Sequence, residues 1–544
     1  MSQGLVWFDA NGQVGCGRNS TPEFRTCLER LPHMDRLGID RALVWSTQAR
    51  DHHAPAGNRR LLAELDAMTV DQRRRFEPSL LIAPSMIYER TADELVEQVR
   101  TRNIRALRVF PAAQSFRLPQ LEELLERLRL LKPVLFINIW DQSSEQELLD
   151  LADRFKQMPI VCMCGMWPHV FNYSLLNVLA RRPNVLLDNS WHHTAGTVER
   201  IVADYGSGRM VFATGNKSHN GAAMGHLLGA DITDAQKHNI AHGNLERLLG
   251  LPATQAADPP PAGRRLAARN EYWQKALDGK KLGLKILDAH GHVGASGIWP
   301  MLDQASPTQI DSAVRAMDRA GIETIIVSEM GALYGDPITG NPNLERKASR
   351  DRKGAGKGAV RILGYFAFNP IYADDLVPML DDCFSRKFFV GIKFLCGYWD
   401  VKVTDPRLEP AMAFANRRRL PVLIHTWDGE HDSPAMLTDI VPRFPDATFL
   451  LGHSGGGDAG RREAVELAKA NPNVYLEWCG SFCSGIPWES TIEQVGNGRV
   501  VFGTDAFGHD LSWELGRFLS LDLPAKTLHP ILGENMRKIL GRRK

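Results

Sequence analysis

Four histidines and one aspartate in the second half of the chain stand at the ends of short apolar runs. His290 and His292 follow the run LKILDA, while His425, His453 and Asp505 end the runs PVLIH, ATFLLGH and RVVFGTD. A single buried histidine is more often a hydrogen-bonded core residue than a ligand. Five such polar groups, however, would be costly to bury without a shared partner, by several kcal/mol. The set therefore predicts a bound metal ion.

Short apolar runs rich in Val, Ile and Leu alternate with longer amphipathic segments such as PTQIDSAVRAMDRAG and PRLEPAMAFANRRR. Continuous apolar runs separated by helices are typical of parallel strands that are buried on both faces. The second half offers eight such runs, which predicts an α/β fold of the (β/α)8 barrel type. The alternative is an open doubly wound sheet, which the absence of a G-x-G-x-x-G turn after the first run makes less favourable.

In a barrel of this kind the chemistry lies at the C-terminal ends of the strands. The five polar residues are placed there, at the ends of the first, fifth, sixth and eighth runs. His290 and His292 are two residues apart on one strand, so both imidazoles point to the same side and can reach one point.

The first half of the chain repeats the second. WFDANGQVG lies on LDAHGHVG, KPVLFINIWD on LPVLIHTWD, GRMVFATGN on GRVVFGTDA, and HNIAHGNLERLLG on HPILGENMRKILG, in the same order. A repeat of about 260 residues predicts two tandem barrels. We expect a first barrel over 1–252, a linker with Pro259–Pro261 and a short helix over 253–283, and a second barrel over 284–544, because proline runs lack the donors that regular elements need.

The order H-x-H, His, His, Asp over strands one, five, six and eight resembles the amidohydrolase superfamily. The phrases GIK, LLGHSGG and ILGENMRKILG resemble its amidohydrolase-related branch of metal-dependent hydrolases and decarboxylases. The resemblance covers the whole second half by motif, and the first half by spacing only.

This resemblance implies roles for the five residues. His290, His292 and His425 would be nitrogen ligands and Asp505 the carboxylate ligand of one divalent ion. Zn is the expected metal, with Mn, Fe or Co as alternatives. Such an ion would lower the pKa of a bound water toward about 7, and Asp505 would accept its proton. His453 would polarise the substrate or transfer a proton.

Three further residues are candidates for substrate binding: Lys393, Trp427 and Asp428. Lys393 ends the fourth run and could hold a substrate carboxylate or phosphate; the alternative is an amine that reaches out to the barrel rim. A dinuclear site bridged by Lys393 is a less favoured alternative. Glu329, Tyr398, Trp399 and His509 also follow strand ends and could line the pocket, although solvation and loop packing explain such residues equally well.

The first half has lost all five residues. The aligned positions carry Asn11, Gln13, Asn138, Gly165 and Gly215, and Arg108 replaces Lys393. Asn and Gln are poor ligands for transition metals, so we expect a pseudoenzyme with an architectural role. A repurposed site is the alternative, but His192, His193, His219, Cys162 and Cys164 show no diagnostic spacing.

Composition sets limits on partners. The 544 residues carry 65 basic and 63 acidic side chains, a net charge of +2, which gives no reason to expect nucleic acid or an anionic membrane. We expect no signal peptide and no membrane span, and the eight scattered cysteines suggest a reducing, cytoplasmic location. The predicted partner is a small-molecule substrate, with the two halves forming an internal pseudo-dimer that could assemble into homo-oligomers.

The predicted function is a metal-dependent hydrolase acting on an amide, lactone or ester. A non-oxidative decarboxylase of a small carboxylic acid is the first alternative, since it needs the same ligands. A non-catalytic binding or scaffold protein is the second, and the intact ligand set of the second half argues against it.

Overall fold

A computed structural model describes residues 5–18, 23–139, 144–163, 173–219, 221–253, 270–295, 309–351, 361–480 and 484–544. The chain forms two compact units, Met1–Lys280 and Lys281–Lys544. In each unit, eight strands form one sheet in the order of the sequence, and every strand pair is parallel.

The strands of the first unit are β1 Phe8–Val14, β2 Arg41–Ser46, β3 Phe76–Leu81, β4 Ala106–Val109, β5 Val134–Asn138, β6 Ile160–Met163, β7 Val185–Asp188 and β8 Met210–Val211. The main helices between and after them are α1 Cys27–Leu37, α3 Ala54–Asp66, α6 Ala92–Thr101, α7 Glu122–Leu128, α8 Glu145–Arg154, α9 Tyr173–Arg181, α10 Thr197–Tyr205, α11 Ala222–Gly229 and α13 Asn244–Leu249.

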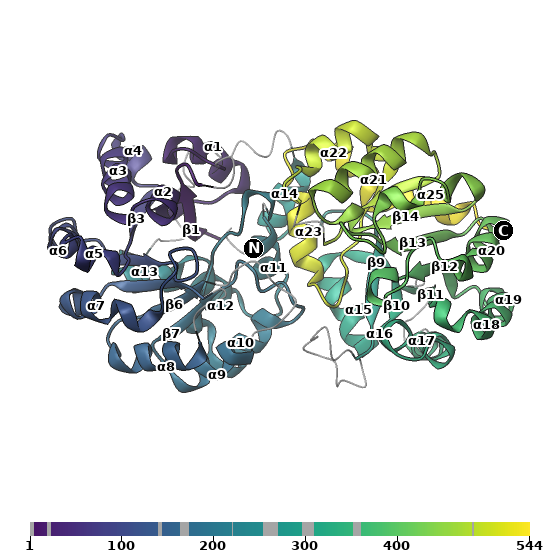
Figure 1. Cartoon of the computed structure of the whole chain (residues 1–544), viewed down its shortest axis with the longest axis horizontal. Helices are drawn as coiled ribbons and strands as arrows, with labels where there is room; N and C mark the ends of the chain where they lie inside the picture. Colours follow the sequence, from purple (N-terminus) through teal and green to yellow (C-terminus); the bar gives the residue numbers. More distant parts are fainter. Residues whose placement is uncertain are drawn as a thin grey trace. The chain divides into compact units, whose positions relative to one another are not determined.

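The strands of the second unit are β9 Ile286–Val293, β10 Ile322–Glu329, β11 Ile362–Ala367, β12 Phe389–Phe394, β13 Pro421–His425, β14 Thr448–Gly452, β15 Val474–Glu477 and β16 Val500–Val501. Its main helices are α15 Gln309–Ala320, α17 Pro337–Asp351, α19 Leu380–Ser385, α20 Glu409–Arg418, α21 Asp458–Ala470, α22 Trp488–Val495, α23 Leu511–Leu519 and α25 Asn535–Gly541. In each unit the helices lie outside the strands (Figure 1).

Both sheets close on themselves. In the first unit the Ala10 amide donates to the Phe212 carbonyl over 3.0 Å, which joins β1 to the end of β8. In the second unit the Ala289 amide donates to Phe502 over 2.9 Å, and the Asp505 amide donates to His290 over 2.8 Å. Closure of this kind distinguishes a barrel from an open sheet, so the prediction of two tandem (β/α)8 barrels is confirmed.

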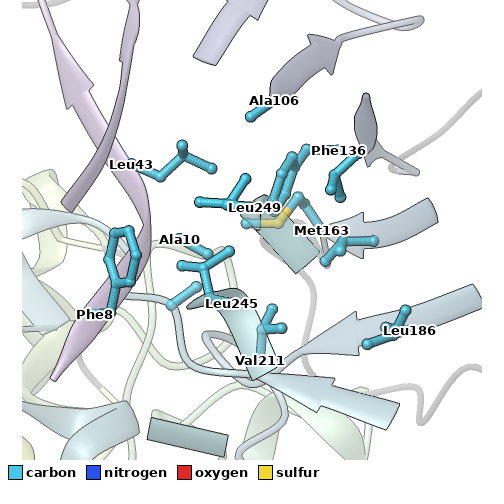
Figure 2. Close-up of a cluster of buried hydrophobic side chains, with 13 residues drawn as sticks. Phe8, Ala10, Leu43, Ala106, Phe136, Met163, Leu186, Val211, Leu245 and Leu249 are labelled. Atoms are coloured by element: carbon cyan, nitrogen blue, oxygen red, sulfur yellow. The ribbon is translucent and has the colours of Figure 1, made fainter. Parts of the chain in front are cut away.

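Strand burial explains why the sequence folds this way. All residues of β12, β13 and β14 are buried, as expected for strands with the barrel interior on one face and helices on the other. Inside the first barrel, side chains such as Phe8, Ala106 and Phe136 pack against Leu245 and Leu249 of the last helix, α13 (Figure 2). The second barrel has the same design, with Met536 and Ile539 of α25 in its core.

The predicted short helix of the linker region is α14, Glu271–Leu277. It packs on the first unit, where the buried Trp273 donates a 3.1 Å hydrogen bond from Nε1 to the Leu37 carbonyl. The proline run Pro259–Pro261 lies outside the described residues, so the domain boundaries stay a prediction. Among the described residues, no helix combines the length and the apolar character needed to cross a membrane.

Candidate metal centre

Strand β9 delivers two histidines to the C-terminal end of the second barrel. His290 is fully buried, and its ring lies 5.1 Å from that of His292. The preceding Asp288 accepts hydrogen bonds from the His290 amide over 3.0 Å and from the amide of Thr504 over 3.1 Å. Asp288 therefore fixes the end of β9 against the segment that follows β16, which holds both histidines in place.

Asp505 faces these two histidines. Its Oδ1 lies 2.9 Å from His292 Nε2 and 3.5 Å from His290 Nε2. Burial alone would raise the pKa of Asp505, but the neighbouring His290 and the hydrogen bond from His292 outweigh it and hold that pKa well below its usual range. The carboxylate is therefore ionised and in contact with two imidazoles.

Lys393, from the end of β12, reaches the same point. Its Nζ lies 3.0 Å from His290 Nε2, and the residue has 0% exposure, so the alternative of an amine at the barrel rim is wrong. Burial lowers the pKa of Lys393, opposed by the charge of Asp505. The nitrogen lone pair that Lys393 contacts is the one that His290 would offer to a metal ion.

His425 and His453 complete the histidine cluster. Their rings lie 4.8 Å apart, and the ring of His453 lies 5.3 Å from that of His290. Trp427 stacks on His425 at 6.0 Å with an interplanar angle of 15°. Burial lowers the pKa of His453 well below its usual value, so its imidazole is neutral.

Two carboxylates orient the histidines from behind. Glu477 Oε2 lies 3.1 Å from His290 Nδ1, and Asp432 Oδ2 lies 2.6 Å from His425 Nδ1. A carboxylate on one ring nitrogen fixes the tautomer and leaves the other nitrogen for a metal, as is usual for metal-binding histidines. Neither acid is among the residues predicted from the sequence. Glu477 ends β15, so the rule of reading strand ends would have found it; Asp432 lies in a loop and carries no such signal.

A cysteine also lies in this cluster and was missed. Cys479 Sγ is 3.1 Å from His290 Nδ1, 3.1 Å from Glu477 Oε2 and 3.6 Å from His453 Nδ1. Burial, and next the charge of Glu477, raise the pKa of the Cys479 thiol well above its usual value.

The remaining predicted substrate-binding residues differ in position. Trp427 is half-buried beside His425 and His453, and a Cβ on Gly456, which has a φ of +62°, would overlap its ring. Asp428 is exposed, and its Oδ1 accepts a hydrogen bond from the amide of Gly460 in α21. This contact fastens the start of the helix; the predicted role of Asp428 in substrate binding stays a prediction.

The donors present suit a divalent cation. Ligand atoms of His290, His453, Cys479 and Asp505 all lie within 4.8 Å of one another. The Nδ1 atom of His292 is buried without a hydrogen-bond partner, while its Nε2 contacts Asp505. Imidazole, thiolate and carboxylate are the ligands that Zn²⁺ takes in proteins. Two of these four residues, His290 and Asp505, belong to the ligand set predicted from the sequence. The other two predicted ligands, His292 and His425, lie next to this group.

The equivalent place in the first barrel is filled by protein contacts. Asn11 Oδ1 accepts from Trp45 Nε1 over 2.9 Å and from Arg108 Nη1 over 3.3 Å, and Asn11 Nδ2 donates to the Thr214 carbonyl over 2.9 Å. Arg108 is 1% exposed, and burial lowers its pKa to about 9. A guanidinium thus lies where a cation would, and the Asn11 carbonyl oxygen, the atom that could bind an ion, already accepts two hydrogen bonds from protein groups.

Other predicted positions of the first barrel agree with this arrangement. A Cβ at Gly215 would overlap His219 Nδ1, so His219 fills the space that a carboxylate would need. Gln13 Nε2 donates to Glu23 Oε2 over 2.5 Å. In the described part of this unit no three His, Cys, Asp or Glu side chains converge as they do in the second barrel. Gly165 and Cys164 lie outside the described residues.

No curated protein matches the chain. Solved structures similar to about half of the chain include an uncharacterised barrel protein from Bordetella bronchiseptica, with 19% identity over 48% of this chain and 99% of that one and a TM-score of 0.38. They also include 5-carboxyvanillate decarboxylase from Sphingomonas paucimobilis, with 14% identity over 48% of this chain and 100% of that one and a TM-score of 0.36. A probable 2-pyrone-4,6-dicarboxylic acid hydrolase from Acinetobacter baumannii has 12% identity over 47% of this chain and 100% of that one and a TM-score of 0.34. The sequence model of the amidohydrolase family matches residues 287–542. This match coincides with the barrel that carries the histidine and aspartate cluster, and the C-terminal barrel therefore belongs to the amidohydrolase family.

Proposed function

We propose that the C-terminal barrel is a zinc-dependent hydrolase of a small organic molecule, acting on a carbonyl-type centre such as an amide, lactone or ester. The observation that carries this proposal is the position of the Asp505 carboxylate, whose Oδ1 lies 2.9 Å from His292 Nε2 and 3.5 Å from His290 Nε2. A divalent ion held by these three residues and His425 would lower the pKa of a water molecule toward about 7 and polarise a carbonyl oxygen.

The protein's own residues then have distinct tasks. Asp505 accepts the proton of the attacking water and passes it to the leaving group. His453, with its neutral imidazole, hydrogen-bonds the substrate's carbonyl oxygen. Lys393, beside His290, binds an anionic oxygen of the substrate, and the apolar ring of Trp427 packs against the substrate next to His425.

A decarboxylase is the second candidate, and one observation favours it. Lys393 is a fully buried amine 3.0 Å from a predicted ligand, which suits a substrate carboxylate held next to the metal. Both candidates would use the same residues and differ only in the bond that breaks.

The experiment separates the candidates by their product. Zinc-loaded protein is offered a panel of lactones, esters, amides and aromatic carboxylic acids, and ring opening or cleavage is monitored beside CO2 release. We expect hydrolysis, lost in Asp505→Asn and His292→Ala but kept in Gln13→Ala, the matched change at the equivalent position of the first barrel. CO2 release instead would establish the decarboxylase. Equal turnover by Asp505→Asn and wild type would contradict both and favour a binding protein.

For the N-terminal barrel we propose a pseudoenzyme with an architectural role. The support is that Asn11 Oδ1 accepts two hydrogen bonds from protein groups and that His219 fills the place beside Gly215. We further propose a cytoplasmic location, since the six described cysteines form no disulfide, and an internal pseudo-dimer of the two barrels. Partial proteolysis tests the architectural role of the N-terminal barrel, cell fractionation tests the location, and light scattering tests the assembly of the chain.

A further inference from the structure

His509 ends the turn that begins at Asp505. The His509 amide donates to the Asp505 carbonyl over 3.2 Å, and His509 Nε2 lies 4.0 Å from Asp505 Oδ2. Asp505 itself has a φ of +57°, in the left-handed region that residues with a side chain rarely adopt. Such a conformation persists where surrounding contacts hold the backbone in place. The contacts of this turn therefore decide where the carboxylate lies.

Glu514, on α23, holds the His509 side chain. Its Oε1 lies 3.2 Å from His509 Nδ1, and its Oε2 accepts from Trp478 Nε1 over 3.0 Å and from Arg517 Nη2 over 2.8 Å. A carboxylate offers only acceptors, so His509 donates from Nδ1 to Glu514. This buried hydrogen bond, the His509–Glu514 tether, fastens the turn after β16 to α23.

The ion pair behind the tether is not required by the barrel fold. Glu514 and Arg517 have 0% and 1% exposed side chains. A buried ion pair of this kind can often be replaced by apolar residues of similar size without loss of stability. The first barrel contains such a replacement, because the repeat sets Met224 and Leu227 of α11 on these two positions, and both are buried. The pair therefore serves a feature that the first barrel lacks.

The equivalent histidine of the first barrel, His219, lies differently. It aligns with His509, as Gly215 aligns with Asp505. A Cβ on Gly215 would overlap His219 Nδ1, so this ring occupies the space that a side chain would need at the strand end. The barrel with the glutamate has both the tether and room for an aspartate, whereas the barrel with the methionine lacks the acceptor of the tether and that room.

We propose that His509 and Glu514 are positioning residues of the metal centre. Their tether fixes the turn that begins at Asp505, and the fixed turn keeps the carboxylate facing the two histidines of β9. The inference rests on the proposed function, because it concerns the centre at which that function is proposed. Groups that orient metal ligands from behind typically lower metal affinity about 10–100-fold when they are removed.

Three substitutions of His509 separate the tether from the other ring nitrogen. His509→Asn keeps a donor near the place of Nδ1, His509→Gln keeps a polar group near the place of Nε2, and His509→Ala keeps neither. Glu514 retains Trp478 and Arg517 in all three variants, so no buried charge is left unpaired. The Zn²⁺ affinity, measured in competition with a chromophoric chelator, should fall about 10–100-fold in His509→Ala and His509→Gln and stay near wild type in His509→Asn.

The visible absorption spectrum of bound Co²⁺ supplies the second readout, because it reports the arrangement of the ligands. His509→Ala should alter this spectrum, and His509→Asn should not. His529→Ala is the matched control, since it removes an exposed histidine–glutamate pair of the same barrel, and it should change neither the spectrum nor the Zn²⁺ affinity.

Wild-type zinc affinity in His509→Ala would overturn the proposal, and so would recovery by Gln rather than by Asn. If His509→Ala does not fold, the comparison of Asn with Gln alone decides. Zinc-loaded wild type that turns over no substrate would overturn the proposed hydrolase, while the affinity comparison would still decide the role of the tether. A chain that binds no zinc after reconstitution would overturn both.

Discussion

Replacing Glu477 with Gln removes a charge from behind the metal centre with almost no change in size. The Glu477 carboxylate contacts His290 Nδ1 at 3.1 Å and accepts from the amides of His453 at 3.0 Å and Cys479 at 2.9 Å. Donors face both of its oxygens, so the amide NH2 of Gln must point at one of them. An unsatisfied buried donor costs about 1–3 kcal/mol.

The larger effect is on metal affinity. Without the carboxylate, His290 loses the partner that fixes its tautomer, and such a loss typically lowers metal affinity about 10–100-fold. Glu477→Gln should therefore weaken Zn²⁺ by that factor in competition with a chromophoric chelator, and lower the free energy of unfolding in urea by about 1–3 kcal/mol. Asp188→Asn is the matched control at the equivalent strand end of the first barrel, and should leave Zn²⁺ affinity unchanged. Zinc affinity of Glu477→Gln within about twofold of wild type would refute the assignment of Glu477 as the residue that orients His290.

Three further predictions follow from single contacts. Lys393→Met should keep the metal content of wild type but raise KM for an anionic substrate by about 10–100-fold, since a charged hydrogen bond contributes about 1.5–3 kcal/mol; an unchanged KM in steady-state kinetics would show that Lys393 does not touch the substrate. Burial, and next the charge of His226, lower the pKa of His192 from 6.5 to about 4. As the pH falls, the unfolded chain therefore takes up this proton before the folded chain does. The free energy of unfolding measured in urea should decrease by up to about 3 kcal/mol between pH 6.5 and pH 4. His192→Gln should remove that part of the acid sensitivity, and a pH profile identical to wild type would contradict it. Gly215→Asp restores a carboxylate to the first barrel but overlaps His219, so it should destabilise the protein and add no metal by mass spectrometry; a second bound ion would contradict the filled site.

The sequence predicted the fold well because the information is local and repeated. The alternation of apolar runs with amphipathic helices, present twice, leaves few alternatives to a pair of barrels. The same regularity predicted that His290, His292 and Asp505 would meet, since strand ends of a barrel converge on one face. In the structure Asp505 Oδ1 lies 2.9 Å from His292 Nε2 and 3.5 Å from His290 Nε2.

What the sequence did not predict depends on contacts between distant segments. Asp432 is in a loop, and only the folded chain brings it to His425. The burial of Lys393 could not be separated from exposure at the rim, because a lysine stem permits both. No paired cysteine spacing surrounds Cys479 to indicate a site, and its histidine neighbours are 26 and 189 residues away in the chain.

We propose that one barrel carries the metal and that the other has lost it. Metal content per chain, measured by plasma mass spectrometry after zinc reconstitution, tests it most directly in wild type, in His290→Ala/His292→Ala and in the matched Asn11→Ala/Gln13→Ala. We expect about one ion per chain in wild type and in the N-terminal variant, and none in the C-terminal variant. Metal that survives the loss of His290 and His292, or a wild type that binds none, would contradict it.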